Sequence, residues 1–107
     1  MTTATSAALP LAAHVRLIRA AADLVEQAGI AGLSVWPDPD EIVIQVPEHA
    51  GDVPARAATV ARLAALTGTQ PARDHRPGPT CGWIQARGMF AGHPVRIYTP
   101  VAKEQAS

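Results

Sequence analysis

The stretch LAAHVRLIRAAADLVEQA, residues 11–28, followed by LSVWPDPDEIVIQV, residues 33–46, decides the fold that we expect for this chain. Its first part repeats apolar residues at helical spacing, and its second part alternates apolar and polar residues around a turn. The same order returns in VPARAATVARLAALT, residues 53–67, and CGWIQARGMFAGHPVRIYT, residues 81–99. The sequence therefore predicts an α+β fold, an α-β-β-α-β-β pseudo-repeat.

The first predicted helix is strongly amphipathic. On a helical wheel its charged residues, such as Arg16 and Glu26, fall opposite one apolar arc of about 180°. The arc contains Leu11, Val15, Leu17, Ile18, Ala21, Ala22, Leu24, Val25 and Ala28. His14 falls within it and is expected to be a packing residue. Gly29 supplies the stop signal at the C-terminal end.

The second predicted helix begins after Asp52, a capping residue, and ends at Gly68. Its apolar stripe is narrow, and its back is covered by small side chains instead of charges. These are Ala55, Ala58, Ala61 and Ala65. Exposed alanine favours a helix in any case, but such a face also allows close approach of another helix. The loop at residues 69–80 is rich in proline and long for a compact domain.

Alternation along the two hairpins separates an inner from an outer face of the predicted sheet. We expect an antiparallel four-stranded sheet with both helices packed on the inner face. The buried core should contain Leu11, Val15, Ile18, Val25, Leu33, Val35, Ile42, Ile44, Val60, Leu63, Ile84, Val95 and Ile97. We expect one domain over residues 10–101, between tails at 1–9 and 102–107, since a chain of this length can bury a core.

The outer face gathers both tryptophans and the single tyrosine of the chain. The residues predicted to lie there are Trp36, Val43, Gln45, Trp83, Gln85, Arg87, Arg96 and Tyr98. Large aromatic groups on an open sheet face usually mark a contact surface. The sequence therefore favours a small non-enzymatic binding or assembly module that acts through this face as a homodimer or with another protein.

Two other functions remain open. Aromatic residues on a sheet stack nucleic-acid bases, and Arg87 and Arg96 would neutralise phosphates, so the face also fits a single-stranded nucleic-acid-binding protein. The zero net charge and the lack of an RNP signature count against it. A small-molecule sensor, with a pocket between sheet and helices, is the third hypothesis.

Signals for catalysis or metal binding are weak. Cys81 could form a thiol–imidazole pair with His75 or His93 only if the fold brought them together. Glu48-His49 with Asp52 (EHAGD, residues 48–52) resembles half of a metal site, but the other histidines lack ligand spacing. The glycines form no phosphate-binding pattern. We therefore expect no catalytic residues, no metal and no cofactor.

Charge and cysteine content bear on partners and location. Residues 1–52 hold two arginines against seven acids, whereas residues 53–107 hold seven basic residues against two acids. This asymmetry indicates self-complementary association or a polar partner, unless the halves neutralise each other within one molecule. The single cysteine rules out an intrachain disulfide. We find no signal peptide or membrane span in the sequence, and expect a cytoplasmic protein without membrane contact.

The runs EIVIQVPEHAGDVPARAATVARLAALTG, residues 41–68, and GWIQARGMFAGHPVRIYTPV, residues 82–101, allow one comparison. In rhythm and composition they resemble small uncharacterised proteins of actinobacteria and of their phages or mobile elements. The resemblance covers residues 30–101. It implies a bacterial cytoplasmic setting and transfers no known active site to this chain.

Overall fold

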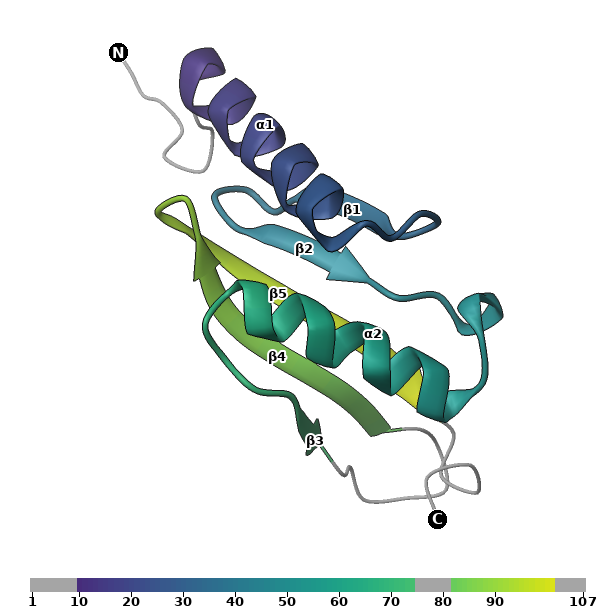
Figure 1. The fold of residues 1–107 in the computed structure, drawn as a ribbon. Helices are drawn as coiled ribbons and strands as arrows, with labels where there is room; N and C mark the ends of the chain where they lie inside the picture. Colours follow the sequence, from purple (N-terminus) through teal and green to yellow (C-terminus); the bar gives the residue numbers. More distant parts are fainter. Residues whose placement is uncertain (1–9, 75–81, 102–107) are drawn as a thin grey trace.

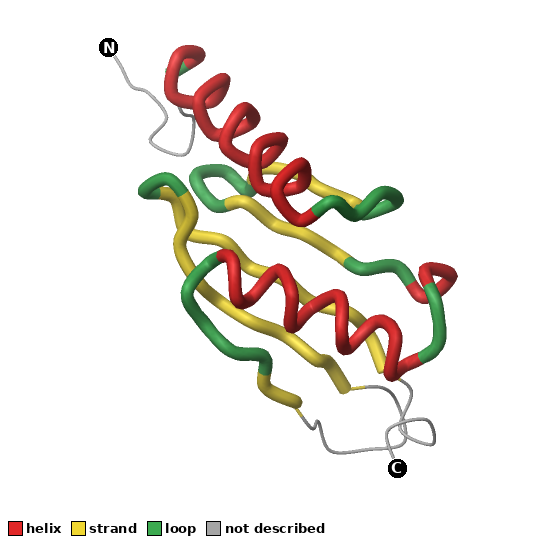
Figure 2. Tube along the Cα trace, viewed as in Figure 1, coloured by secondary structure: helices red, strands yellow, loops and turns green. Residues whose placement is uncertain are grey.

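The computed structural model describes residues 10–74 and 82–101, without the side chains of Arg73 and Asp74. The elements run in the order α1 (Leu11–Ala28), β1 (Ser34–Pro37), β2 (Ile42–Gln45), a 3-10 turn (Glu48–Ala50), α2 (Val53–Leu66), β3 (Ala72–Asp74), β4 (Gly82–Phe90) and β5 (His93–Val101). Figures 1 and 2 show both helices on one side of a single twisted sheet. The predicted α+β class is confirmed, and the six predicted elements follow one another in the predicted order, with β3 added between α2 and β4.

Two details of the predicted sheet are corrected. The sheet has five strands in the order β1-β2-β5-β4-β3, because Ala72–Asp74, inside the predicted loop 69–80, pairs with β4. It is also mixed, since β2 and β5 run parallel. Alternation and tight turns fix pairs within a hairpin. They do not fix the direction in which two hairpins meet, which here depends on the crossover through α2.

The repeat concerns the order of elements and not a symmetry of the fold. In both units the second strand of the hairpin lies at the sheet centre, and these two strands, β2 and β5, are parallel. Both helices lie on the same face (Figure 1). No rotation superposes the two helix–hairpin units, because their positions on the sheet are related as mirror images. The two halves therefore offer different surfaces.

The ends of the helices follow the predicted signals. Gly29 ends α1 in the left-handed conformation, with φ at 68°, and its N–H donates to the Val25 and Glu26 carbonyls. Asp52 caps α2 by accepting a hydrogen bond of 2.9 Å from the Ala55 N–H. In the part of the chain that the structure describes, no helix is long and apolar enough to cross a membrane.

The core lies between the helices and the inner face of the sheet. Most of the predicted core is confirmed: Ile42, Ile44, Val60, Leu63, Ile84, Val95 and Ile97 are buried, and Leu33 and Val35 pack against them.

The prediction is wrong for the outer part of the α1 arc. Leu11 is 77% exposed and Ile18 is 46% exposed, while Val15 and Val25 are half-buried. Leu17, Ala20, Ala21, Leu24 and Ala28 face the core instead. The apolar arc of α1 is wider than the surface that the sheet and α2 can cover, so part of it is left over.

Candidate functional site

The eight predicted surface residues do share the face of the sheet opposite the helices, which we call the outer face. The strand pairing aligns Trp36 with Val43, Val43 with Arg96, and Arg96 with Arg87 in one row. The next row aligns Gln45, Tyr98 and Gln85, and Trp83 follows next to Pro100. Their neighbours along each strand, such as Ile44 and Ile97, belong to the core. Neither helix covers this face.

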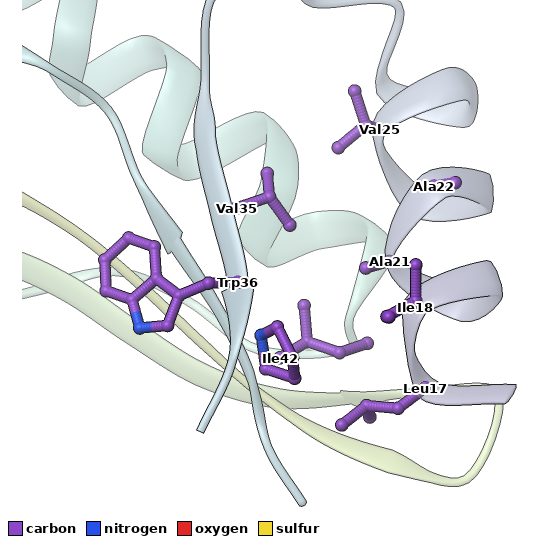
Figure 3. Close-up of a pocket in the computed structure, with 9 residues that line it drawn as sticks. Leu17, Ile18, Ala21, Ala22, Val25, Val35, Trp36 and Ile42 are labelled. Atoms are coloured by element: carbon purple, nitrogen blue, oxygen red, sulfur yellow. The ribbon is translucent and has the colours of Figure 1, made fainter. Parts of the chain in front are cut away.

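Side chains on the outer face cover one another. Val43 is fully buried although it lies on an open face, between the cross-strand partners Trp36 and Arg96. Trp36 itself is 37% exposed. In Figure 3 its indole ring points away from α1, on the other side of β1 from Val35. The aromatic surface is therefore ordered by contacts within the sheet before any partner binds.

Trp83 and Tyr98 form a second aromatic group on this face. Their ring centroids are 5.2 Å apart and their planes are inclined by 76°, an edge-to-face arrangement. The two residues lie diagonally across β4 and β5, since Trp83 pairs with Pro100 and Gln85 pairs with Tyr98. Such pairs are favourable beyond the area that they bury. The rings are half-buried and held in a defined geometry.

The two arginines of the outer face differ in their surroundings. Arg87 and Arg96 are direct cross-strand partners, which places like charges side by side. The guanidinium of Arg96 approaches two carboxylates, with Nη2 3.7 Å from Oδ2 of Asp38 and Nε 3.5 Å from Oε1 of Glu41. Nε is buried and makes no hydrogen bond within the described chain, so the contact is an ion pair only. Arg87 is exposed.

A separate apolar groove lies between α1 and the edge strand β1 (Figure 3). Its volume is about 230 Å³. Its lining residues are Leu17, Ile18, Ala21, Ala22, Val25, Val35, Trp36, Pro37 and Ile42. The sequence analysis allowed for a pocket between sheet and helices but did not indicate these lining residues, because Ile18 and Val25 were assigned to the core.

Arg56 is a buried arginine whose position the sequence analysis did not predict. It lies in the first turns of α2 but is only 3% exposed. Its Nη1 donates to Oγ1 of Thr99 at 2.9 Å and to the Pro100 carbonyl, and its Nε donates to the Gly51 carbonyl at 3.0 Å. The spacing of Arg56, Val60 and Leu63 (i, i+4, i+7) was a signal that it faces inward. Its role is to join α2 to β5.

The described residues include only some of the weak catalytic and metal candidates. Cys81 and His75 lie outside the described residues, and His93 begins β5 next to the hairpin turn. Glu48 and His49 are exposed, and Asp52 is used as the cap of α2. Among the described residues, no three side chains of metal-binding type form a group.

Comparisons of the chain with protein-family models, curated proteins and solved structures find no match. The functional conclusion therefore rests on the geometry of the two surfaces.

Proposed function

We propose that this protein is a small non-catalytic binding and assembly module that forms a homodimer through the outer face of its sheet. The observation that carries the proposal is the open sheet face itself. It holds Trp36, Trp83 and Tyr98, while both helices pack on the opposite side. Large apolar groups exposed together on one face usually mark a contact surface. A bacterial cytoplasmic setting is part of the proposal.

The outer face has the composition that a two-fold contact requires. In such a dimer the same patch meets itself, so the patch must be self-complementary. Aromatic rings pack against one another, and the amides of Gln45 and Gln85 can both donate and accept hydrogen bonds across the axis. Arg87 would lie at the rim or near an acid of the partner copy, since like charges across the axis repel. Two sheets packed in this way lie about 10 Å apart.

Trp83→Ala is expected to weaken the dimer by about tenfold or more, because large aromatic anchors dominate interface energies. Sedimentation at a series of protein concentrations measures the dissociation constant. Ala61→Glu, on the exposed alanine face of α2, is the control and should leave this dimer nearly unchanged. Circular dichroism of both variants checks that they are folded. Wild-type protein that stays monomeric at several hundred micromolar would contradict the proposal.

Single-stranded nucleic acid is the second candidate partner, favoured by the exposed Arg87 on the same face as the Trp83–Tyr98 pair. It ranks lower for two reasons. Arg96 already lies near Asp38 and Glu41, and the edge-to-face rings cover part of each other's surface. Binding to an oligonucleotide that weakens steeply with salt, in a monomeric wild-type protein, would favour this function. The groove at α1 is smaller than most small-molecule sites, which are about 300–1,000 Å³, so a sensor is not favoured.

A further inference from the structure

Helix α1 carries a continuous apolar strip that the core does not use. The strip, which we call the α1 stripe, consists of Leu11, Val15, Ile18, Ala22 and Val25. Leu11 is 77% exposed and Ile18 is 46% exposed. On the helical wheel the stripe lies between the core-facing residues and the charged side, so that Val15 is next to Glu26 and Arg19. A strip of aliphatic side chains along several helical turns is costly in water, since each buried CH₂ contributes about 0.8 kcal/mol.

The α1 stripe lies above the edge of the sheet. Ile18, Ala22 and Val25 line the groove from the helix, and Val35 and Pro37 line it from β1, which is the edge strand (Figure 3). Stripe and groove thus form one apolar surface that opens beyond the sheet edge, away from α2. This surface meets the outer face only at Trp36, which lines the groove while its ring points to the outer face.

The edge of β1 is poorly suited to pairing with a further strand. The Asp38 N–H donates to the Glu41 carbonyl, which places Trp36 and Ser34 in hydrogen-bonded pairs with β2. The outward backbone groups then belong to Val35 and Pro37, and proline has no N–H. One free donor in a four-residue strand is too little for strand addition. A partner at this surface should therefore be a helix.

The charges of α1 indicate which helix would bind at this surface. Arg16 and Arg19 lie in its first half, and Asp23 and Glu26 lie in its second half, all of them exposed. This order does not favour an isolated helix. The like charges are spaced i, i+3, and Glu26 lies in the last turn, where the helix dipole disfavours an anion. Only Arg19 and Asp23 have opposite charges at i, i+4.

A second copy of α1 packed antiparallel removes the conflict. Its basic half then lies along the acidic half of the first copy, at both ends of the contact, whereas parallel packing would place like charges together. Ala22 allows close approach of the two helices, and the aliphatic side chains of each copy can enter the groove of the other. A single occupant, the second α1 helix, would thus cover the stripe, fill the groove and pair the charges.

We propose that the α1 stripe and its groove bind the α1 helix of a second copy of this chain, antiparallel across a two-fold axis. This interface is independent of the outer face and goes beyond the function proposed above. Because both contacts are two-fold and use different surfaces, a chain that has both assembles beyond a dimer. A chain that has one of them stops at a dimer.

Leu11→Glu tests the interface with little risk to the fold, since Leu11 is 77% exposed, and Ile18→Glu tests its centre. Each should weaken the contact by about tenfold or more in sedimentation experiments. Ala61→Glu adds the same charge on the exposed alanine face of α2 and should have no such effect. Unchanged assembly in both Leu11→Glu and Ile18→Glu would overturn the proposal, as would a monomeric wild-type protein.

Charge reversal tests whether the partner is another copy. Reversing only Arg16→Glu and Arg19→Glu should weaken the contact. Adding Asp23→Arg and Glu26→Arg should restore it, because the two copies remain complementary. A foreign partner with fixed charges would give no restoration, and that result would overturn the proposal.

Comparison with Trp83→Ala separates the two interfaces. If Leu11→Glu abolishes assembly and Trp83→Ala does not, the result supports the α1 interface and contradicts the dimer through the outer face. If Trp83→Ala abolishes assembly and Leu11→Glu does not, the result supports the dimer through the outer face and contradicts the α1 interface.

Discussion

Arg56→Met is expected to lower the free energy of unfolding by about 3 kcal/mol. The substitution keeps a long apolar stem but removes every donor of the guanidinium. Thr99, Pro100 and Gly51 each lose a hydrogen bond from Arg56, and Thr99 and Arg56 are buried. An acceptor that loses its partner away from water costs more free energy than the hydrogen bond had contributed. Removing a buried charge offsets part of this loss, because desolvation of a cation is itself unfavourable.

Chemical denaturation followed by circular dichroism measures the effect. Arg62→Met, an exposed arginine on the same helix, is the matched control and should stay within about 0.5 kcal/mol of wild type. Arg56→Lys keeps the charge but not the planar fork that bonds several acceptors, so its stability should lie between wild type and Arg56→Met. An Arg56→Met protein as stable as the control would show that Arg56 does not hold α2 on β5.

Gly88→Ala is expected to lower the free energy of unfolding by about 3 kcal/mol, because the added methyl group has no room. A Cβ at this position would lie 2.4 Å from the Thr67 carbonyl oxygen and 2.6 Å from Thr67 Oγ1. Thr67 cannot easily move. It ends α2, its hydroxyl donates to the carbonyls of Leu63 and Ala64, and its own carbonyl accepts from the Met89 N–H at 3.0 Å. Helix and strand would have to separate.

Gly32→Ala provides the comparison for this experiment. Gly32 has φ at 84° and nothing within 4 Å of the position of a Cβ, so alanine there costs only backbone strain, about 1 kcal/mol. The melting temperature should therefore fall further for Gly88→Ala, by roughly 4–8 °C for each kcal/mol of difference. Equal losses in the two variants would mean that the α2–β4 contact can relax around an extra methyl group.

Local patterns predicted the elements of this fold well. The α1 helix begins and ends where the apolar period and Gly29 indicate, and β4 and β5 meet at the turn of Ala91 and Gly92. The tight turn works because both residues have positive φ, 52° and 82°. Strand β3 was not predicted, since three residues in a proline-rich loop carry no alternation. The parallel pairing of β2 with β5 was not predicted either, because no local signal fixes it.

The candidate surfaces were predicted unequally. Alternation assigned all eight residues to the outer face, because a strand turns successive side chains to opposite sides whatever the sheet order. It did not indicate that Arg96 lies near Asp38 and Glu41, or that Trp83 meets Tyr98 edge to face. The α1 stripe was read as core. A helical wheel gives the width of an apolar arc but not the width of the surface that covers it.

The sequence by itself determined the type of every element except β3, the helix ends, the hairpin turns and the face to which each residue of the two predicted hairpins belongs. These depend on φ preferences, capping groups and periods of a few residues, all of which act along the chain. Only the tertiary structure decided how the hairpins pair, which part of α1 stays exposed, and that Arg56 is buried against Thr99. Those outcomes depend on contacts between segments far apart in the chain. Several apolar surfaces compete for burial there, and the spacing of residues along the chain does not show which of them is buried.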